Sequence, residues 1–421
     1  MKQIIKKGSF LTLMFLLLGC LSLYAADNDL ITEQITINLE KAGTLPDRIA
    51  SSEKYKITNL KIIGEINGTD LRMIREMAGS NSTGNSTDGK LSVLDLSEAK
   101  IVEGGDCYYY DDADYYYTSN DVIGPSAFEY CSGLTSLTLP AGITKIGSRA
   151  FYGCSGLTSL NLPAGITYIG DNAFSYCSGL TSLTLPAGIT SIGWNAFEGC
   201  SGLTSLNLPA GITKIGNDAF SGCSGLTSLN LPAGITSIGD GAFYGCSGLT
   251  SLSLPAGITE IGDFAFNCCS GLTSLTLPDG ITSIGEYAFH GCSGLTSLNL
   301  PAGITSIDIA AFEGCSGLTS IYVYAEKVPR IDSDVFKGVD AKKCTLYVPM
   351  GTRDDYCASD FGYYFENIVE FDATGIDKTT TSTDVEEVAR YSVNGQRLSA
   401  PTKGLNIVKY SDGSVKKVAV Q

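Results

Sequence analysis

The sequence predicts a solenoid of the α/β type dominated by β-structure, with a parallel sheet, capped ends and a small C-terminal antiparallel β domain. Three observations predict it: a strict 23-residue repeat, apolar residues at the same places in every copy, and irregular copies at both ends. A fixed period of this size is the signature of stacked structural repeats. We therefore expect one long array, although 421 residues would otherwise suggest two or three compact domains.

The repeat unit is long and almost invariant. It reads Cys-Ser-Gly-Leu-Thr-Ser-Leu-x-Leu-Pro-Ala-Gly-Ile-Thr-x-Ile-Gly-x-x-Ala-Phe-x-x, as in residues 200–222. Nine cysteines occupy its first position at intervals of 23 residues: Cys131, Cys154, Cys177, Cys200, Cys223, Cys246, Cys269, Cys292 and Cys315.

The order of residues within the unit indicates how one coil folds. Residues 203–208 end in an alternation of apolar and polar residues, which predicts a half-buried strand. Ile212 and Ile215 predict a second, short inward-facing segment, and Ala219-Phe220 predicts a tight helical or 3₁₀ corner. One coil cannot bury its own apolar side chains, so we expect coils stacked about 4.8 Å apart around a continuous core.

Irregular copies extend the array at both ends. Residues 57–62 and 91–96 follow the strand pattern on the N-terminal side, and residues 70–78 have the spacing of a short helix. Residues 318–336 form a degenerate copy, and residues 344–349 are the last strand that we expect. Terminal coils have to cover the open ends of the core. About eleven coils would make a rod on the order of 50 Å long.

Charge and histidine content exclude several function classes. A net charge of -16 would repel a phosphate backbone, so we expect no nucleic-acid partner. His290 is the only histidine, which excludes sites built on two histidines, including the common zinc hydrolase sites. We expect no cofactor, no metal site and no catalytic residue.

The N-terminal residues have the pattern of an export signal. Three lysines precede an apolar run at residues 10–18, which is too short to span a bilayer permanently. We expect cleavage after Ala25. In the alternative, Leu17-Leu18-Gly19-Cys20 resembles a bacterial lipobox, and Cys20 would carry lipid. Either way the protein is expected to be exported, and to lie at the cell surface (outer membrane) or to be secreted.

The composition changes after residue 371, where a polar, Thr-rich linker begins. Alternating runs with Asn394-Gly395 and Asp412-Gly413 then predict a small antiparallel β unit. The predicted parts are a signal peptide (1–25), an N-terminal cap with the first strand-like coil (26–90), the solenoid with an insertion at 97–121 (91–370), a linker (371–388) and a C-terminal β domain (389–421).

Two resemblances follow from these motifs. The unit Leu-x-x-Leu-x-Leu-Pro, Ile-x-x-Ile-Gly and Ala-Phe-x-x-Cys resembles the leucine-rich repeats of BspA-type bacterial surface proteins, over residues 57–350. This resemblance implies surface display and adhesion to host extracellular proteins or neighbouring cells. The tail, through residues 394–397, 404–408 and 416–418, resembles the sorting domains of the type nine secretion route in Bacteroidetes-like bacteria. The alternative is a plain terminal β domain without an anchoring role.

The cysteines have two interpretations. Exported proteins often use cysteine for disulfides. Cysteines at one position of stacked coils instead form a column, in which a free thiol behaves as a small apolar group; this is the interpretation that we prefer. Cys107, Cys268, Cys344 and Cys357 lie outside the column and are candidates for pairing near the caps.

The candidate contact residues are exposed aromatic side chains at positions that vary between copies, together with the insertion, where six tyrosines surround three aspartates. Aromatic residues, and tyrosine in particular, supply large contact areas in binding surfaces. The insertion could instead hold Ca²⁺ through its aspartates, be mobile, or cover the cap. The candidates are Tyr108, Tyr109, Tyr110, Tyr115, Tyr116, Tyr117, Tyr168, Trp194, Phe264 and Tyr287.

Three functions are compatible with this pattern. The first is a non-catalytic adhesin whose partners are extracellular or host proteins, or glycans, and which contacts the membrane only through a lipid or sorting-domain anchor. The second is a structural spacer of the cell envelope. The third, an enzyme using carboxylates such as Asp263 and Glu286, is disfavoured because the sequence indicates no apolar pocket around them.

Overall fold

The computed structural model describes residues 30–373, 387–392, 397–398, 400, 404–410 and 415–420. The chain forms two compact units, Met1–Phe371 and Asp372–Gln421, which are described separately. The predicted signal peptide, both candidate cleavage positions and most of the predicted linker lie outside the described residues.

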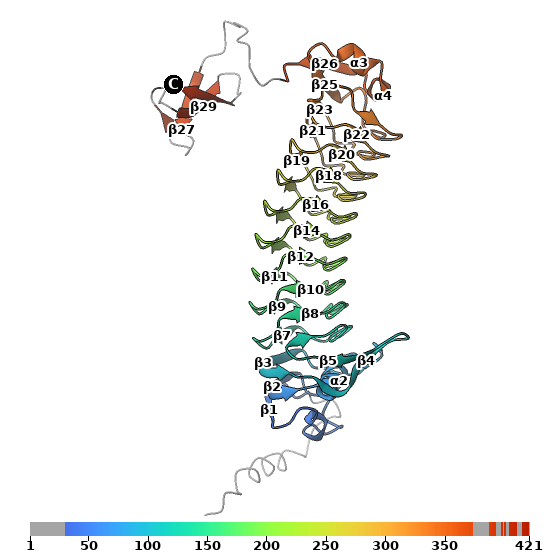
Figure 1. The fold of residues 1–421 in the computed structure, drawn as a ribbon, viewed down its shortest axis with the longest axis vertical. Helices are drawn as coiled ribbons and strands as arrows, with labels where there is room; N and C mark the ends of the chain where they lie inside the picture. The colour runs from blue at the N-terminus through green and yellow to red at the C-terminus, as the bar shows by residue number, and fades with distance from the viewer. Residues whose placement is uncertain are drawn as a thin grey trace, which may run out of the picture. The chain divides into compact units, whose positions relative to one another are not determined.

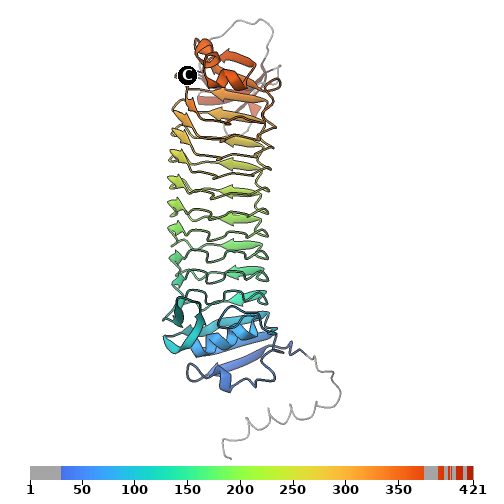
Figure 2. The same ribbon diagram turned by 90° about the vertical axis from the view of Figure 1, so that its right-hand side faces the viewer.

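The first unit is a column of stacked coils that share a 14-stranded parallel sheet, so the predicted β-rich solenoid is confirmed (Figure 1). Within the repeats the strands pair in register, as Leu183 does with Leu206, and Figure 2 shows them stacked along the column. The strands are β1 (Ile35–Leu39), β2 (Asn59–Ile66), β3 (Val93–Ile101), β7 (Ser136–Thr138), β9 (Ser159–Asn161), β11 (Ser182–Thr184), β13 (Ser205–Asn207), β15 (Ser228–Asn230), β17 (Ser251–Ser253), β19 (Ser274–Thr276), β21 (Ser297–Leu300), β23 (Ser320–Val323), β25 (Thr345–Pro349) and β26 (Asn367–Phe371).

The second inward-facing segment of each coil forms two-residue strands on another side of the column. These strands make two parallel sheets, because β10 and β12 do not pair. They are β6 (Val122–Ile123), β8 (Lys145–Ile146) and β10 (Tyr168–Ile169) in one sheet, and β12 (Ser191–Ile192), β14 (Lys214–Ile215), β16 (Ser237–Ile238), β18 (Glu260–Ile261), β20 (Ser283–Ile284), β22 (Ser306–Ile307) and β24 (Arg330–Ile331) in the other.

The core is built from columns of identical residues. The rings of successive phenylalanines, from Phe128 to Phe336, stack with centroids 5.2–5.7 Å apart and planes within 8° of parallel. Beside them, each repeat thiol from Cys154 to Cys315 donates a hydrogen bond of 3.0–3.3 Å to a phenylalanine carbonyl of the preceding coil. The nine repeat cysteines are free and buried, so the thiol column is confirmed.

The corner of each coil differs from the predicted 3₁₀ turn. Hydrogen bonds span three residues there, as from the Cys223 amide to the Phe220 carbonyl (3.1 Å). However, the residue two after the glycine has a left-handed backbone, for example Asp218 at φ 53° and Phe264 at φ 57°. A left-handed residue ends a regular helical turn. The corner is therefore an irregular turn, whose Phe220 amide bonds to the Ala242 carbonyl of the next coil (2.8 Å).

The caps extend further than the sequence predicted. At the N-terminal end β1 precedes the expected first strand, and at the C-terminal end β26 follows the strand expected to be last. The stack of 14 strands is therefore about 60 Å long at the usual strand spacing. This exceeds the length of about 50 Å expected for a rod of eleven coils.

Short helices complete both caps. The predicted helix at residues 70–78 is confirmed as α2 (Gly68–Met77), which Asn67 and Asp70 cap reciprocally; a 3₁₀ turn, η1 (Leu45–Asp47), precedes it. The other end is covered by α3 (Arg353–Cys357) and α4 (Asp360–Tyr364). There Phe361 and Phe365 contact Phe336, with ring centroids 5.8 and 5.1 Å away, and so end the phenylalanine column.

The insertion at 97–121 is an ordered antiparallel hairpin, formed by β4 (Gly104–Tyr110) and β5 (Tyr115–Thr118). Figure 1 shows it projecting from the side of the column near its N-terminal end. The first residues of the predicted insertion belong to β3, which continues to Ile101.

The second unit contains a four-stranded antiparallel sheet, as the alternating pattern predicts. Its order is β28 (Arg397–Leu398), β27 (Glu387–Ser392), β29 (Gly404–Tyr410) and β30 (Val415–Val420). The expected turns at Asn394-Gly395 and Asp412-Gly413 lie outside the described residues.

Candidate partner-binding surfaces

Two tyrosines of the hairpin belong to the core, which corrects their prediction as contact residues. Tyr108 is fully buried and donates a hydrogen bond to the Pro125 carbonyl (2.7 Å), and Tyr109 is 6% exposed. Burial raises the pKa of both phenols, that of Tyr109 to about 12. An insertion without a repeat offers no pattern to tell its inward-facing tyrosines from its outward-facing ones.

A buried ionic cluster fixes the base of the hairpin. The fully buried Arg75 guanidinium lies 4.7 Å from the Tyr109 ring centroid and donates to the Ser126 and Glu129 carbonyls, at 2.6 and 3.1 Å. The buried Glu129 carboxylate in turn lies 3.2 Å from the Arg149 guanidinium. The hairpin is therefore anchored to the helix α2 and to the first two repeat corners.

The remaining hairpin tyrosines and the tyrosines of three successive coil corners form two groups, which together we call the tyrosine ridge: Tyr110, Tyr115, Tyr116 and Tyr117 on the hairpin, and Tyr130, Tyr152 and Tyr176 on the corners. On the hairpin, Tyr110 and Tyr115 stack with their ring centroids 5.6 Å apart. On the corners, Tyr152 lies edge-on to Tyr130 at 5.4 Å and to Tyr176 at 5.5 Å. Tyr115, Tyr117, Tyr130 and Tyr176 are 41–65% exposed.

Polar groups hold the ridge in place. The Arg149 guanidinium lies 4.8 Å from the Tyr152 ring centroid, and Tyr176 donates to the Glu198 carboxylate (2.8 Å). This hydrogen bond raises the pKa of Tyr176 above its ordinary value. The Asp111 carboxylate accepts the amides of Ala113 and Asp114 at 3.0 and 2.9 Å, which closes the hairpin turn and lowers the Asp111 pKa.

Sequence reasoning selected only part of this ridge. Tyr130 and Tyr152 were not among the predicted residues, although they occupy the variable positions before two successive repeat cysteines. Tyr176 does so in the next copy. Three consecutive copies with tyrosine beside a tyrosine-rich insertion are the signal that would have found them.

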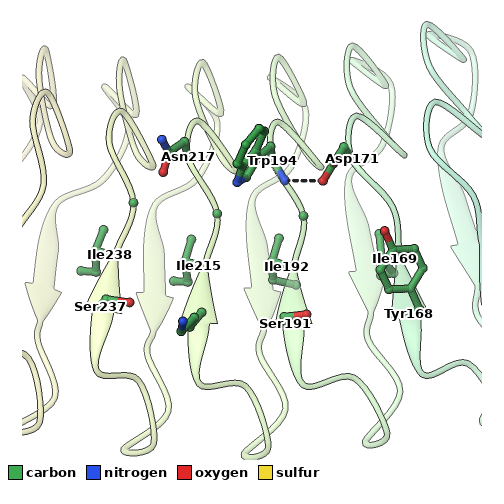
Figure 3. A pocket seen from close by; sticks show the side chains of 14 residues that line it. Tyr168, Ile169, Asp171, Ser191, Ile192, Trp194, Ile215, Asn217, Ser237 and Ile238 are labelled. Carbon is green, nitrogen blue, oxygen red and sulfur yellow. Dashed lines mark hydrogen bonds between the residues drawn. The ribbon is translucent and has the colours of Figure 1, made fainter.

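Tyr168 and Trp194 lie elsewhere, on a groove of about 410 Å³ where β10 and β12 fail to pair. Figure 3 shows Tyr168 and Trp194 on two neighbouring coils, beside a row of isoleucines that continues along the coils beyond Trp194. The Tyr168 side chain is 46% exposed and that of Trp194 is 64% exposed. The Trp194 amide donates to the Asp171 carboxylate of the preceding coil (2.9 Å), which fixes the corner that carries the indole.

The last two predicted residues form a third, separate cluster further along the column. Phe264 stacks on Tyr287 with ring centroids 5.1 Å apart, and Tyr287 contacts His290 edge-on at 5.6 Å. Phe264 is 39% exposed and Tyr287 is half-buried. The ten predicted residues thus divide between the core, the ridge, the groove and this pair.

Burial makes the repeat thiols poor nucleophiles. It raises the pKa of Cys131 to about 11 and those of Cys223 and Cys292 to about 12. A thiol reacts as its thiolate, so these groups are inert at neutral pH. The predicted pairing of cysteines near the caps is wrong, because Cys107, Cys268, Cys344 and Cys357 are all free.

The carboxylates considered for catalysis also have a structural use. The Asp263 carboxylate accepts a hydrogen bond from the Glu286 amide of the next coil (2.8 Å), and the Asp240 carboxylate accepts one from the Asp263 amide (3.1 Å).

The described residues bring no three His, Cys, Asp or Glu side chains together in a group that could hold a metal ion. Within the same residues, no helix has the length and apolar character needed to cross a bilayer.

The stacked coils, with a 14-stranded parallel sheet and leucines in register along it, define the class of leucine-rich repeat solenoids. A model of the BspA-type leucine-rich repeat region matches residues 115–227 and 213–343, which together make up more than half of the chain. The chain therefore belongs to the BspA-type leucine-rich repeat family, a family of repeat scaffolds compatible with protein–protein interaction.

Solved structures of similar proteins come from several bacteria. A leucine-rich repeat protein from Bacteroides ovatus is 24% identical over 77% of this chain and 86% of its own, with a TM-score of 0.40. A leucine-rich cell surface protein from Faecalibacterium prausnitzii is 26% identical over 62% and 85%, with a TM-score of 0.36. An internalin from Listeria monocytogenes is 16% identical over 73% and 86%, with a TM-score of 0.24. A comparison with curated proteins finds no match.

Proposed function

We propose that this protein is a non-catalytic adhesin that binds extracellular proteins of a host or of neighbouring cells through its tyrosine ridge. One observation carries the proposal: partly exposed tyrosines pack against one another on the hairpin and, as a second group, on three successive corners of the same end of the column. Tyrosine provides contact area at a low cost in conformational entropy. The anchoring of the hairpin by Arg75 and Tyr108 keeps this surface rigid before binding.

Export and surface attachment are part of the same proposal. The N-terminal residues have the charge and length pattern of a signal peptide. The antiparallel sheet of the second unit is compatible with a sorting domain that delivers the protein to the outer membrane or releases it. Mass spectrometry of the mature protein would identify its first residue and any lipid on Cys20.

Binding by ridge variants tests the adhesin proposal. The full chain, immobilised, is exposed to soluble extracellular-matrix proteins and to neighbouring bacterial cells. We expect Tyr115→Ser combined with Tyr117→Ser to weaken retention about tenfold or more, because exposed aromatic anchors carry much of the binding free energy. Deleting residues 97–121 would be a poor test, because it would also remove Tyr108 and Tyr109 from the core.

Tyr363 offers a matched control for the same change of residue. It is 85% exposed and lies on α4, at the other end of the first unit. Tyr363→Ser should therefore leave retention unchanged. If the ridge variant binds like Tyr363→Ser for every probe, the ridge is not the contact surface and the protein acts as a spacer of the cell envelope.

A further inference from the structure

The groove between Tyr168 and Trp194 has a chemistry that differs from that of the ridge and from that of the rest of the surface. Its floor consists of Ile169, Ile192, Ile215 and Ile238, with the glycines that follow the last three. These isoleucines are at most 4% exposed, so the groove contains no deep apolar pocket for an anchoring side chain. The groups available to a ligand are two flat rings and a row of polar side chains.

The polar row follows the register of the short strands. Ser191 pairs with Lys214 and Lys214 with Ser237, and the three side chains are exposed. Among the described residues, the Lys214 side chain forms no ion pair or hydrogen bond, so its ammonium is available as a donor. Lys214 and Asp171 are the charged residues of the lining. The groove is thus charge-balanced on a chain whose net charge is -16.

These features select among ligand classes. A polyanion would gain little from one ammonium beside one carboxylate, and it would be repelled by the acidic chain. A peptide strand has no room to insert between the unpaired edges of β10 and β12, because β9 and β11 remain paired across the same two coils and hold them at strand spacing. An uncharged sugar suits the groove, because its C–H face packs on an aromatic ring and its hydroxyls both donate and accept hydrogen bonds.

We infer that this groove is a binding site for a neutral glycan, which runs along the row of isoleucine strands, packs on the rings of Tyr168 and Trp194 and is hydrogen-bonded by Lys214 and its neighbouring serines. The site goes beyond the proposed function of the ridge and does not depend on it. A glycan bound here would add a second, chemically distinct contact to the same column.

Trp194 makes the inference directly measurable, because it is the only tryptophan of the chain. The intrinsic tryptophan fluorescence of the full chain is titrated with mannan, galactan, laminarin and dextran as neutral probes, and with heparin and gelatin as an acidic glycan and a peptide. We expect at least one neutral glycan to produce a saturable blue shift and to protect Trp194 from iodide quenching. Heparin and gelatin should do neither.

Variants separate a groove effect from a general one. Tyr168→Ala and Lys214→Ala should each weaken the titration about tenfold or more. Phe264→Ala removes an exposed ring outside the groove and should leave it unchanged. An unaltered unfolding midpoint shows that each variant is folded.

Three outcomes would overturn the inference: no response to any of the neutral probes, a response to heparin or gelatin alone, or a neutral-glycan response that Tyr168→Ala does not weaken. None of them would bear on the ridge, since the Tyr115 and Tyr117 variant leaves the groove intact. Failure of the ridge test would likewise leave the groove inference standing.

Discussion

Each repeat cysteine contributes to the core as a neutral thiol. Cys223, for example, donates to the Phe197 carbonyl at 3.2 Å and is fully buried. The thiolate would lose both its hydration and this hydrogen bond, which is why burial raises the pKa of Cys223 to about 12. The strict 23-residue spacing allowed this column to be predicted, because residues at one position of stacked coils have to lie above one another.

The raised thiol pKa values predict a loss of stability in alkali. In the unfolded chain a thiol ionises near its ordinary pKa of about 8.5, well below its pKa in the folded chain. Unfolding therefore releases protons above that pH, and the stabilisation that is fully present at pH 7 is lost as the pH rises towards 12. Each repeat thiol should lower the free energy of unfolding by about 1.4 kcal/mol per pH unit once the unfolded state is ionised.

Urea unfolding between pH 7 and pH 10.5 measures this slope. Tyrosine and lysine side chains also titrate near the upper end of the range, so Cys223→Ala serves as the control. That variant should be less stable at pH 7 but should lose stability less steeply with pH. Equal slopes in the parent and the variant would show that the buried thiols are not responsible.

At the scale of elements, the hairpin β4–β5 is both a cover for the cap and a display for the ridge. Tyr108 and Tyr109 point into the core, while Tyr115 and Tyr117 lie on the surface. The fold of the repeated part of the chain was predictable because the regular spacing of its apolar residues indicates which side chains face inward. The hairpin has no such period, so the sequence suggested its tyrosines as a group without separating these two roles.

Substitution in the hairpin should separate its two roles. Tyr108→Ala removes a fully buried ring and its hydrogen bond to Pro125, and should lower the free energy of unfolding of the N-terminal cap by about 3 to 4 kcal/mol. Tyr115→Ala changes an exposed ring and should cost about 0.5 kcal/mol or less. Hydrogen exchange of the cap amides measures the loss of stability in each variant. A similar loss of protection in the two variants would refute the assignment of Tyr108 to the core.

At the scale of the whole solenoid unit, each coil contacts mainly the coils before and after it, as in other repeat proteins. Threonine hydroxyls link each coil to the one before it along the sheet. The Thr227 hydroxyl donates to the Thr204 carbonyl, and the Thr250 hydroxyl donates to the Thr227 carbonyl, both at 3.3 Å. The ridge and the groove both end before the coil of β17. Coils beyond them should therefore extend the column without contributing to either surface.

Removal of a single coil tests this account most directly. Deletion of residues 270–292 joins Cys269 to Ser293, preserves the repeat and leaves the ridge and the groove intact. We predict cooperative unfolding, an unchanged β-sheet circular dichroism signal per residue and unchanged ridge-dependent binding for this variant. Deletion of residues 270–281, about half a coil, should disrupt all three. If the two deletions are equally disruptive, or if the in-phase deletion abolishes binding, the coils are not interchangeable units and the account is wrong.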